Sequence, residues 1–216
     1  TSNVYNMSFM FYHCSSLKEL DLSNFDTKNV TSLSFMFSGC KALKELNINH
    51  FDVSNVTDIE ETFANMKMDK IDLSNWVAPK LKNVYTMFVH SEFREINISN
   101  LDFSNLKAES SMGFLDGWES VFYNCNYLEK LYTPKVTGSQ DIELPFDDYS
   151  IVENGNYSDT RYNLLPKNLS KSVVLERNTV EYTTWQKDYT YTLYTADSEG
   201  KFGDGTVMPG TVETAS

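Results

Sequence analysis

Carboxylate side chains recur along the chain with a spacing of 25 or 26 residues, and Glu19 and Glu45 are one such pair. Two carboxylates about 5 Å apart are the machinery of a retaining glycoside hydrolase, and neighbouring strands of a sheet give a similar spacing. A repeat produces such pairs by geometry alone, and Lys18 and Lys44 flank this pair, so a solvated ladder of side chains is the preferred interpretation. We therefore predict no catalytic residues and no enzyme activity.

Metal binding is the second chemistry that the acidic residues allow. Asp21, Asp26 and Asp52 offer carboxylate oxygens for a Ca²⁺ ion. A calcium site needs six to eight oxygen ligands, more than these three residues supply without further partners. The calcium alternative stays open, but we predict no metal ligands and no cofactor.

Histidines and cysteines offer no recognisable nucleophile. His13, His50 and His90 occupy different repeat positions, and none lies beside a Ser or Cys in a known catalytic motif. Three cysteines make no disulfide framework and lack the close pairs of a zinc site. They fall at one repeat position, as Cys14, Cys40 and Cys125. We expect Cys14 and Cys40 to be reduced and buried.

The elements that must position these residues come from an internal repeat. Its first part reads L-x-x-L-x-L, in which alternate apolar residues predict a short strand. The copies are Leu17/Leu20/Leu22, Leu43/Leu46/Ile48, Met68/Ile71/Leu73, Phe93/Ile96/Ile98 and a degenerate Leu128/Leu131/Thr133. The last copy follows after 35 residues, which indicates an insertion within 106–114.

The second part of the repeat has apolar residues at i, i+3, i+6 and i+7, a spacing that predicts one side of a short helix. Its copies are Val4/Met7/Met10/Phe11, Val30/Leu33/Met36/Phe37, Val56/Ile59/Thr62/Phe63, Leu81/Val84/Met87/Phe88 and Leu115/Trp118/Val121/Phe122. Another recurring position holds Phe25, Phe51, Trp76 and Leu101, which we interpret as core. Because one copy cannot bury its own apolar face, the copies are expected to stack as a solenoid.

Strand residues beside the inward leucines should line the concave face of the sheet in two columns. The columns are Glu19/Glu45/Lys70/Glu95/Lys130 and Asp21/Asn47/Asp72/Asn97/Tyr132. In the second column amides separate the carboxylates, which limits repulsion between neighbours. The predicted binding residues are Glu19, Asp21, Glu45, Asn47, Lys70, Asp72, Glu95 and Asn97.

The repeat stops after residue 131. Pro134 follows the last copy and cannot donate to a strand ladder. Asn154-Gly155 between short apolar runs predicts a hairpin. Alternation of Tyr, Thr and Val with polar residues predicts strands over Thr179–Trp185 and Tyr189–Thr195, before a glycine-rich segment at Gly200–Gly210.

The run SLKELDLSNFDTKNVTSLSFMFSGC resembles the BspA-type leucine-rich repeat of bacterial surface proteins. Residues 14–37 match the pattern C-x-x-L-x-x-L-D-L-S-N-F-D-T-x-N-V-T with M-F closely, and residues 41–131 match it loosely. The resemblance implies a leucine-rich-repeat fold in an exported protein linked to adhesion. We predict an α/β class: a right-handed leucine-rich-repeat solenoid of about five turns over 1–131, starting mid-repeat. Residues 132–216 should form a mostly β C-terminal cap or the start of a further module.

Charge and hydropathy narrow the choice of partners. There are 30 acidic and 18 basic residues, and the net charge of -12 disfavours nucleic acid and anionic lipid. No apolar run reaches 18 residues, so membrane insertion is not expected. Asn3-Val4 aligns with Asn29-Val30, so the chain is expected to begin inside a repeat and to be a piece of a longer parent.

Two function classes follow from the repeat and the resemblance. The first is a recognition or adhesion module on the bacterial cell surface, extracellular, that binds a host protein or a glycan over a broad surface. The second is a structural spacer that projects another domain from the cell wall. We expect the chain to be a monomer that can associate end to end. Its ligand is expected to be basic or neutral.

Overall fold

The computed structural model describes residues 1–104, 106, 121–137, 142–146, 149–158, 160–168, 171–177, 192–193 and 206–207. The chain divides into two compact units, Thr1–Asn178 and Thr179–Ser216. In the second unit β7 (Thr192–Leu193) pairs antiparallel with β8 (Thr206–Val207). Both residues of β7 lie inside the segment Tyr189–Thr195, which was predicted to be a strand. The strand predicted over Thr179–Trp185 lies outside the described residues, and the predicted division of the chain at 131/132 stays a prediction.

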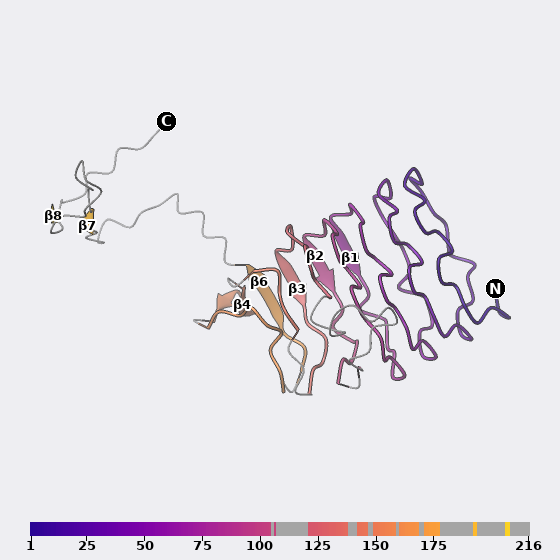
Figure 1. Cartoon of the computed structure of the whole chain (residues 1–216). Coiled ribbons are helices and arrows are strands. Elements are labelled where there is room, and N and C mark those ends of the chain that lie inside the picture. Colours follow the sequence, from indigo (N-terminus) through magenta and orange to yellow (C-terminus); the bar gives the residue numbers. More distant parts are fainter. Residues whose placement is uncertain are drawn as a thin grey trace. The chain divides into compact units, whose positions relative to one another are not determined.

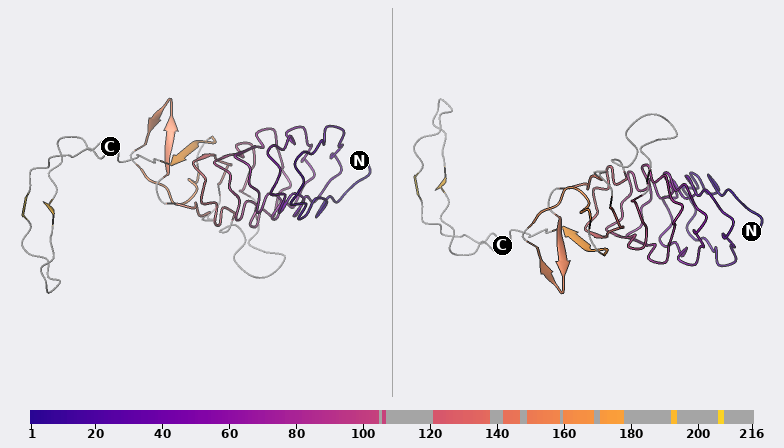
Figure 2. Two further views of the ribbon diagram at one scale, coloured as in Figure 1. Left: turned by 90° about the horizontal axis from the view of Figure 1, so that it is seen from above. Right: turned by 90° about the horizontal axis from the view of Figure 1, so that it is seen from below.

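The first unit contains a six-stranded mixed sheet in the order β1-β2-β3-β6-β4-β5 (Figure 1). Its strands are β1 (Lys70–Asp72), β2 (Glu95–Asn97), β3 (Lys130–Tyr132), β4 (Tyr149–Glu153), β5 (Asn156–Tyr157) and β6 (Val174–Arg177). The views in Figure 2 show the repeat copies following one another in chain order from the N-terminal end.

The parallel part of the sheet is built from three copies of the repeat. Ile71 pairs with Ile96, and Ile96 with Leu131, in parallel register. In each three-residue strand the middle residue is buried and its two neighbours face outward. The predicted alignment of these copies is therefore confirmed, including the 35-residue step from Ile96 to Leu131. The insertion predicted within 106–114 lies outside the described residues, except for Leu106.

The strands predicted in the first two copies, over 17–22 and 43–48, are absent from the described structure. No backbone hydrogen bond joins these two described segments. The described link between these two segments is made by a side chain. A ring nitrogen of His50, just after the second segment, lies 3.1 Å from the Leu22 carbonyl oxygen. The apolar alternation of Leu20 and Leu22 therefore marks inward packing without strand pairing.

Antiparallel strands extend the sheet beyond β3. β6 pairs with β3, β4 with β6 and β5 with β4. Asn154 and Gly155 connect β4 to β5 with φ angles of 53° and 77°. Two left-handed residues are what a two-residue hairpin of type I′ requires, so the predicted hairpin is confirmed.

The second part of the repeat forms a series of turns, and the predicted short helices are wrong. Its backbone donates sideways to the next copy: Met7 N–H to the Ser32 carbonyl at 3.0 Å, Phe9 to Ser34 at 3.0 Å and Phe11 to Met36 at 2.9 Å. An α-helix needs those donors for the carbonyl four residues earlier. Parallel bridges Asn6↔Ser32, Ser32↔Asp58 and Asp58↔Asn83 join the same copies. We call this surface the turn face.

The predicted fold class, an α/β right-handed leucine-rich-repeat solenoid, is therefore wrong. The described residues contain no helix, and their regular structure is the six-stranded mixed sheet and the β7–β8 pair. The apolar spacing of i, i+3, i+6 and i+7 was consistent with a helix. The same spacing arises here because successive turns of the backbone also place these apolar side chains on one side, facing the core.

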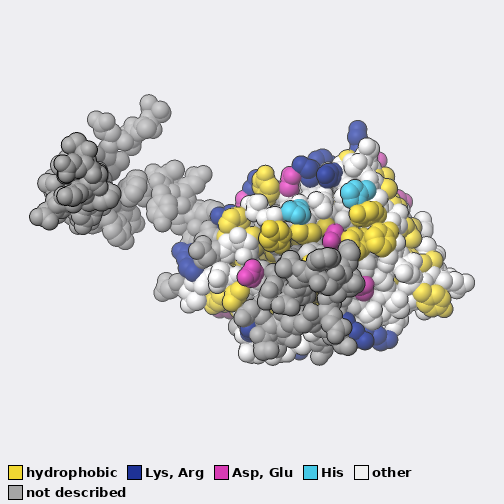
Figure 3. All heavy atoms as spheres, viewed as in Figure 1, with side chains coloured by type: hydrophobic (Ala, Val, Ile, Leu, Met, Phe, Trp, Pro, Cys, Tyr) yellow, Lys and Arg dark blue, Asp and Glu magenta, His cyan; other side chains and the backbone are white. Residues whose placement is uncertain are grey.

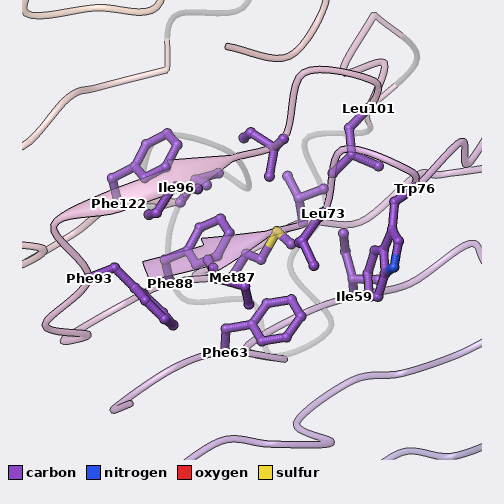
Figure 4. Close-up of a cluster of buried hydrophobic side chains, with 14 of the residues drawn as sticks. Ile59, Phe63, Leu73, Trp76, Met87, Phe88, Phe93, Ile96, Leu101 and Phe122 are labelled. Atoms are coloured by element: carbon purple, nitrogen blue, oxygen red, sulfur yellow. The ribbon is translucent and has the colours of Figure 1, made fainter. Parts of the chain in front are cut away.

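Aromatic side chains stacked from copy to copy form the core of the first unit (Figure 4). Phe63 and Phe88 have ring centroids 5.7 Å apart, and Phe88 and Phe122 are also 5.7 Å apart. Phe51 and Trp76 stack at 6.5 Å and are buried, which confirms that this repeat position is core. Of the fifth quartet, Val121 and Phe122 are buried and the other two residues lie outside the described ones.

The cysteine prediction is partly wrong. All three cysteines are free thiols, and Cys40 and Cys125 are buried. Cys14 is exposed, because it lies in the first copy, which has a neighbouring copy on one side alone in this chain. Burial raises the pKa of the Cys40 thiol to about 11 and that of Cys125 to about 12, which keeps both protonated at neutral pH.

Candidate functional site

A depression of about 480 Å³ lies on the sheet face that the sequence predicted as the binding surface. Its lining includes the predicted residues Glu45, Asn47, Lys70, Asp72, Glu95 and Asn97, together with Lys44, Asn49 and Tyr132. Glu19 and Asp21 are exposed and are not among its lining residues. We call this region the strand-face depression. The structure thus gathers most of the predicted set and leaves the first copy outside it.

Opposite charges alternate along one column of this face. Lys70 is in register with Glu95, Glu95 with Lys130, and Lys130 with Glu176 of β6. The Lys130 ammonium lies 2.8 Å from a Glu176 carboxylate oxygen, and the Tyr157 hydroxyl donates to Glu176 at 2.9 Å. Hydrogen bonding to Lys130 lowers the pKa of Glu176, and the same bond raises the pKa of Lys130. Both groups are therefore charged over a wide pH range.

Tyr132 closes one end of the strand-face depression. The Lys130 ammonium lies 5.3 Å from the centroid of the Tyr132 ring, within the range of a cation–π contact. Because Lys130 also pairs with Glu176, its position is held from two sides. Tyr132, the half-buried aromatic ring in the lining, therefore has a fixed cation beside it, whereas Glu45 at the other end of the depression is exposed.

Three positions of the second predicted column, Asp21, Asp72 and Asn97, have a structural task. An Oδ1 atom accepts a hydrogen bond from the backbone N–H two residues later in Asp21, Asp72 and Asn97, at 2.9, 2.9 and 3.2 Å. Such Asx turns end the strand segments. The bond from Ser23 lowers the pKa of Asp21.

The calcium alternative gains no support from the described residues. Asp26 accepts the Lys28 N–H at 3.2 Å and pairs with the Lys28 ammonium at 2.9 Å, while Asp52 accepts the Ser54 N–H at 2.9 Å. Each carboxylate thus serves its own turn. Within the part of the chain that the structure describes, no group of three or more His, Cys, Asp or Glu side chains could hold a metal.

The histidines are likewise part of the architecture. His50 contacts the Leu22 carbonyl, and a ring nitrogen of His90 lies 3.2 Å from the Asn124 amide nitrogen. The ring of His13 packs against that of Tyr12 with centroids 4.2 Å apart. None of the described contacts of these three rings is with a serine or cysteine side chain.

A second depression, of about 750 Å³, lies on the turn face and was missed from the sequence. It is lined by Asn6, Ser8, Phe9, Tyr12, Ser32, Ser34, Phe35, Asp58 and Glu60. The signal was present, because Phe9 and Phe35 share a repeat position, but a helix was expected there and the ring orientation could not be inferred. Figure 3 shows that hydrophobic side chains also gather in a band on one face of the molecule.

Comparison with known proteins places the N-terminal part of the chain near one bacterial family. Residues 1–101 match the family described as Mycoplasma protein of unknown function, DUF285. No curated protein and no solved structure matches the chain significantly. The finer resemblance to BspA-type repeats stays a prediction. No helix among the described residues is long and apolar enough to cross a membrane.

Proposed function

We propose that the chain is an extracellular recognition module of a bacterial cell-surface protein, which binds a host protein or polysaccharide through the strand-face depression. The observation that carries the proposal is the lining of that depression. Its side chains differ from copy to copy, whereas the core positions repeat. One column of the lining is Glu45, Lys70 and Glu95, and the other is Asn47, Asp72, Asn97 and Tyr132. Differing exposed residues on a repetitive scaffold are typical of binding surfaces in repeat proteins.

The chemistry of the depression favours a basic or neutral partner. Glu45, Asp72 and Glu95 accept hydrogen bonds, and the chain carries a net charge of -12 that repels polyanions. Asn47 and Asn97 add groups that both donate and accept, which suits hydroxyl groups or peptide bonds. The bacterial family match agrees with a surface location, and the resemblance to surface-protein repeats adds the link to adhesion.

A quadruple variant tests this proposal: Asp21→Asn, Glu45→Gln, Asp72→Asn and Glu95→Gln. Asparagine keeps the Asx turns, so the fold should be retained while four charges are lost. A matched control removes the same charge from exposed carboxylates elsewhere, with Asp69→Asn, Glu129→Gln, Glu143→Gln and Glu153→Gln. Binding is measured against immobilised matrix proteins and a glycan array. We expect the first variant to lose binding and the control to keep it; unchanged binding in both would contradict a role for the strand face.

A structural spacer is the second candidate, and the repeated cross-copy side-chain bonds favour it. Asn29 donates to the Ser2 carbonyl at 2.8 Å, and Asn55 donates to the Lys28 carbonyl at 2.7 Å. Such equivalent bonds stiffen a stack of copies without presenting a site. If the wild-type chain binds nothing in these screens while its parent protein adheres through another domain, the spacer is the better account.

A further inference from the structure

One position of the repeat holds a cysteine or a serine in four of its copies, and the backbone around it is the same each time. The residues are Cys14, Cys40, Ser91 and Cys125. In all four, the backbone N–H donates at 3.1 Å to the carbonyl of the phenylalanine three residues earlier. The geometry between one pair of neighbouring copies at this position therefore applies to another pair. We call this position the thiol column.

The fourth and fifth copies show how closely two side chains of the thiol column approach each other. Ser91 Oγ lies 3.7 Å from Cys125 Sγ. The Cys125 thiol donates to the Phe88 carbonyl at 3.0 Å, so its sulfur leans toward the preceding copy. Side chains of the column thus meet across the boundary between two copies.

Cys40 leans toward the first copy in the same way. Its thiol donates at 3.1 Å to the Phe11 carbonyl, which is the equivalent of the Phe88 carbonyl. Its neighbour in the column is Cys14, which carries a thiol where Ser91 carries a hydroxyl. Burial, together with the nearby Cys14, raises the pKa of the Cys40 thiol to about 11. The first two copies therefore bring two thiols together where the last two bring a hydroxyl and a thiol.

The spacing of the first two copies suits a disulfide bond. Just before the thiol column, the His13 N–H donates to the Ser38 carbonyl at 2.8 Å. Segments joined by such ladder bonds lie about 4.8 Å apart, and disulfides join Cα atoms about 4.4–6.8 Å apart. The Phe11 and Phe37 ring centroids are 5.7 Å apart, the same separation as between the fourth and fifth copies. This spacing is set within the two copies and does not depend on what precedes them.

We propose that Cys14 and Cys40 form a disulfide bond by exchange with a small disulfide such as oxidised glutathione. The Cys14 thiolate attacks one glutathione sulfur, the S–S bond of glutathione breaks, and a mixed disulfide forms as one glutathione leaves. The Cys40 thiolate then attacks the Cys14 sulfur and releases the second glutathione. Two protein thiols are oxidised, one glutathione disulfide is reduced, and the two thiol protons end on the two glutathione molecules.

The bond would fasten the first copy to the second. Cys14 and Cys40 are 26 residues apart in the sequence, so the bond closes a loop and restricts the unfolded chain. Disulfides persist in the oxidising surroundings outside cells, which the extracellular location in the proposed function would supply. Neither cysteine is among the lining residues of the strand-face depression, so failure of this inference would leave the proposed binding surface untouched.

The test treats the 216-residue chain with glutathione buffers of increasing oxidised fraction, followed by alkylation, digestion and mass spectrometry. We expect the loss of two thiols and a cross-linked peptide pair that holds Cys14 and Cys40, with Cys125 still free. Release of the second glutathione should quicken about tenfold per pH unit between about pH 7 and pH 9, because the Cys40 thiol is protonated there. Glutathione left on Cys14, a dimer linked through Cys14, or unchanged thiols as the end product would overturn the proposal.

Two variants assign the bond to its cysteines. Cys40→Ser should stop the reaction at the mixed disulfide of Cys14 with glutathione, and a serine already occupies this column as Ser91. The matched control is Cys125→Ser, which makes the same change in the same column and should leave the cross-link intact. A cross-link that survives Cys40→Ser or is lost in Cys125→Ser would contradict the assignment. Melting curves verify folding; if Cys40→Ser does not fold, Cys14→Ser replaces it and should abolish the cross-link.

Discussion

Each copy of the repeat has two positions on the turn face where the backbone is left-handed. Among the described residues at these positions, one is a glycine. The residues are Phe9, Phe35, Glu61 and Thr86 at one position and His13, Gly39, Asn65, His90 and Asn124 at the other. The repetition indicates that the turn itself demands this conformation. A non-glycine residue is therefore accepted at a cost wherever its side chain contributes a contact.

Gly39 is the position where this cost is best measured. Its φ is 79°, and a Cβ added there would meet the Cα and ring atoms of His13 at 3.3 Å. Gly155 has a φ of 77° with nothing within 4 Å of the added Cβ, so it is a matched control for the backbone term. We expect both Gly39→Ala and Gly155→Ala to destabilise by about 1 kcal/mol from backbone strain, and Gly39→Ala to lose more because His13 must shift. Urea denaturation measures both; equal losses would show that the contact is unimportant.

At the scale of elements, the chain joins copies by short ladders and by side chains that cross from one copy to the next. Positions that repeat with one chemistry were predictable, namely the register of Ile71, Ile96 and Leu131 and the aromatic core positions. The Asn154-Gly155 hairpin was predictable from its turn residues. The helices were mispredicted because apolar spacing reports which side chains turn inward and not where the backbone N–H groups donate. The first two strands were mispredicted because alternation does not guarantee pairing.

Trp76 shows how a side chain replaces strand pairing between copies. Its Nε1–H donates to the Ile48 carbonyl at 3.0 Å, and its ring stacks on Phe51 at 6.5 Å. Trp76→Phe keeps the stacking but leaves the buried Ile48 carbonyl without that donor and opens space in the core. We expect a loss of about 2–3 kcal/mol in the free energy of unfolding.

Chemical denaturation of Trp76→Phe measures this loss. The control is Phe51→Leu, which removes a ring from the same aromatic stack without removing a side-chain hydrogen-bond donor. If Trp76→Phe costs no more than about 0.5 kcal/mol, the bond to Ile48 contributes little and stacking alone joins these copies.

At the scale of the whole molecule, the two depressions differ in how far the sequence could reveal them. The strand-face depression follows from period-2 alternation, which places Glu45, Lys70 and Glu95 on one outward side. The turn-face depression depends on the left-handed turns that orient Phe9 and Phe35, and the residue types at that repeat position, Phe, Glu and Thr, do not reveal a left-handed backbone. Surfaces made by regular elements were therefore predictable, and surfaces made by turns were not.

The stability of this unit should fall toward its first copy, and the turn-face hydrogen bonds allow a matched comparison. Met7, Phe9 and Phe11 donate to the second copy at 3.0, 3.0 and 2.9 Å. Their equivalents in the third copy, Ile59, Glu61 and Phe63, each donate to the fourth copy at 3.0 Å. The bonds are alike, but the third copy has a neighbour on both sides and the first copy has one.

Stability in a stack of copies is close to a sum of nearest-neighbour terms, so the first copy opens without disturbing the rest. Phe9 and Met10 are 53% and 41% exposed there, whereas their equivalents in the second copy, Phe35 and Met36, are 8% and 0% exposed and so bury more apolar surface. We expect amide hydrogens of Met7, Phe9 and Phe11 to exchange about tenfold or more faster than those of Ile59, Glu61 and Phe63 in a dilute monomer. Residue-resolved hydrogen exchange measures this difference. Equal protection of the two sets would mean that the first unit opens as one cooperative body, with no weaker end.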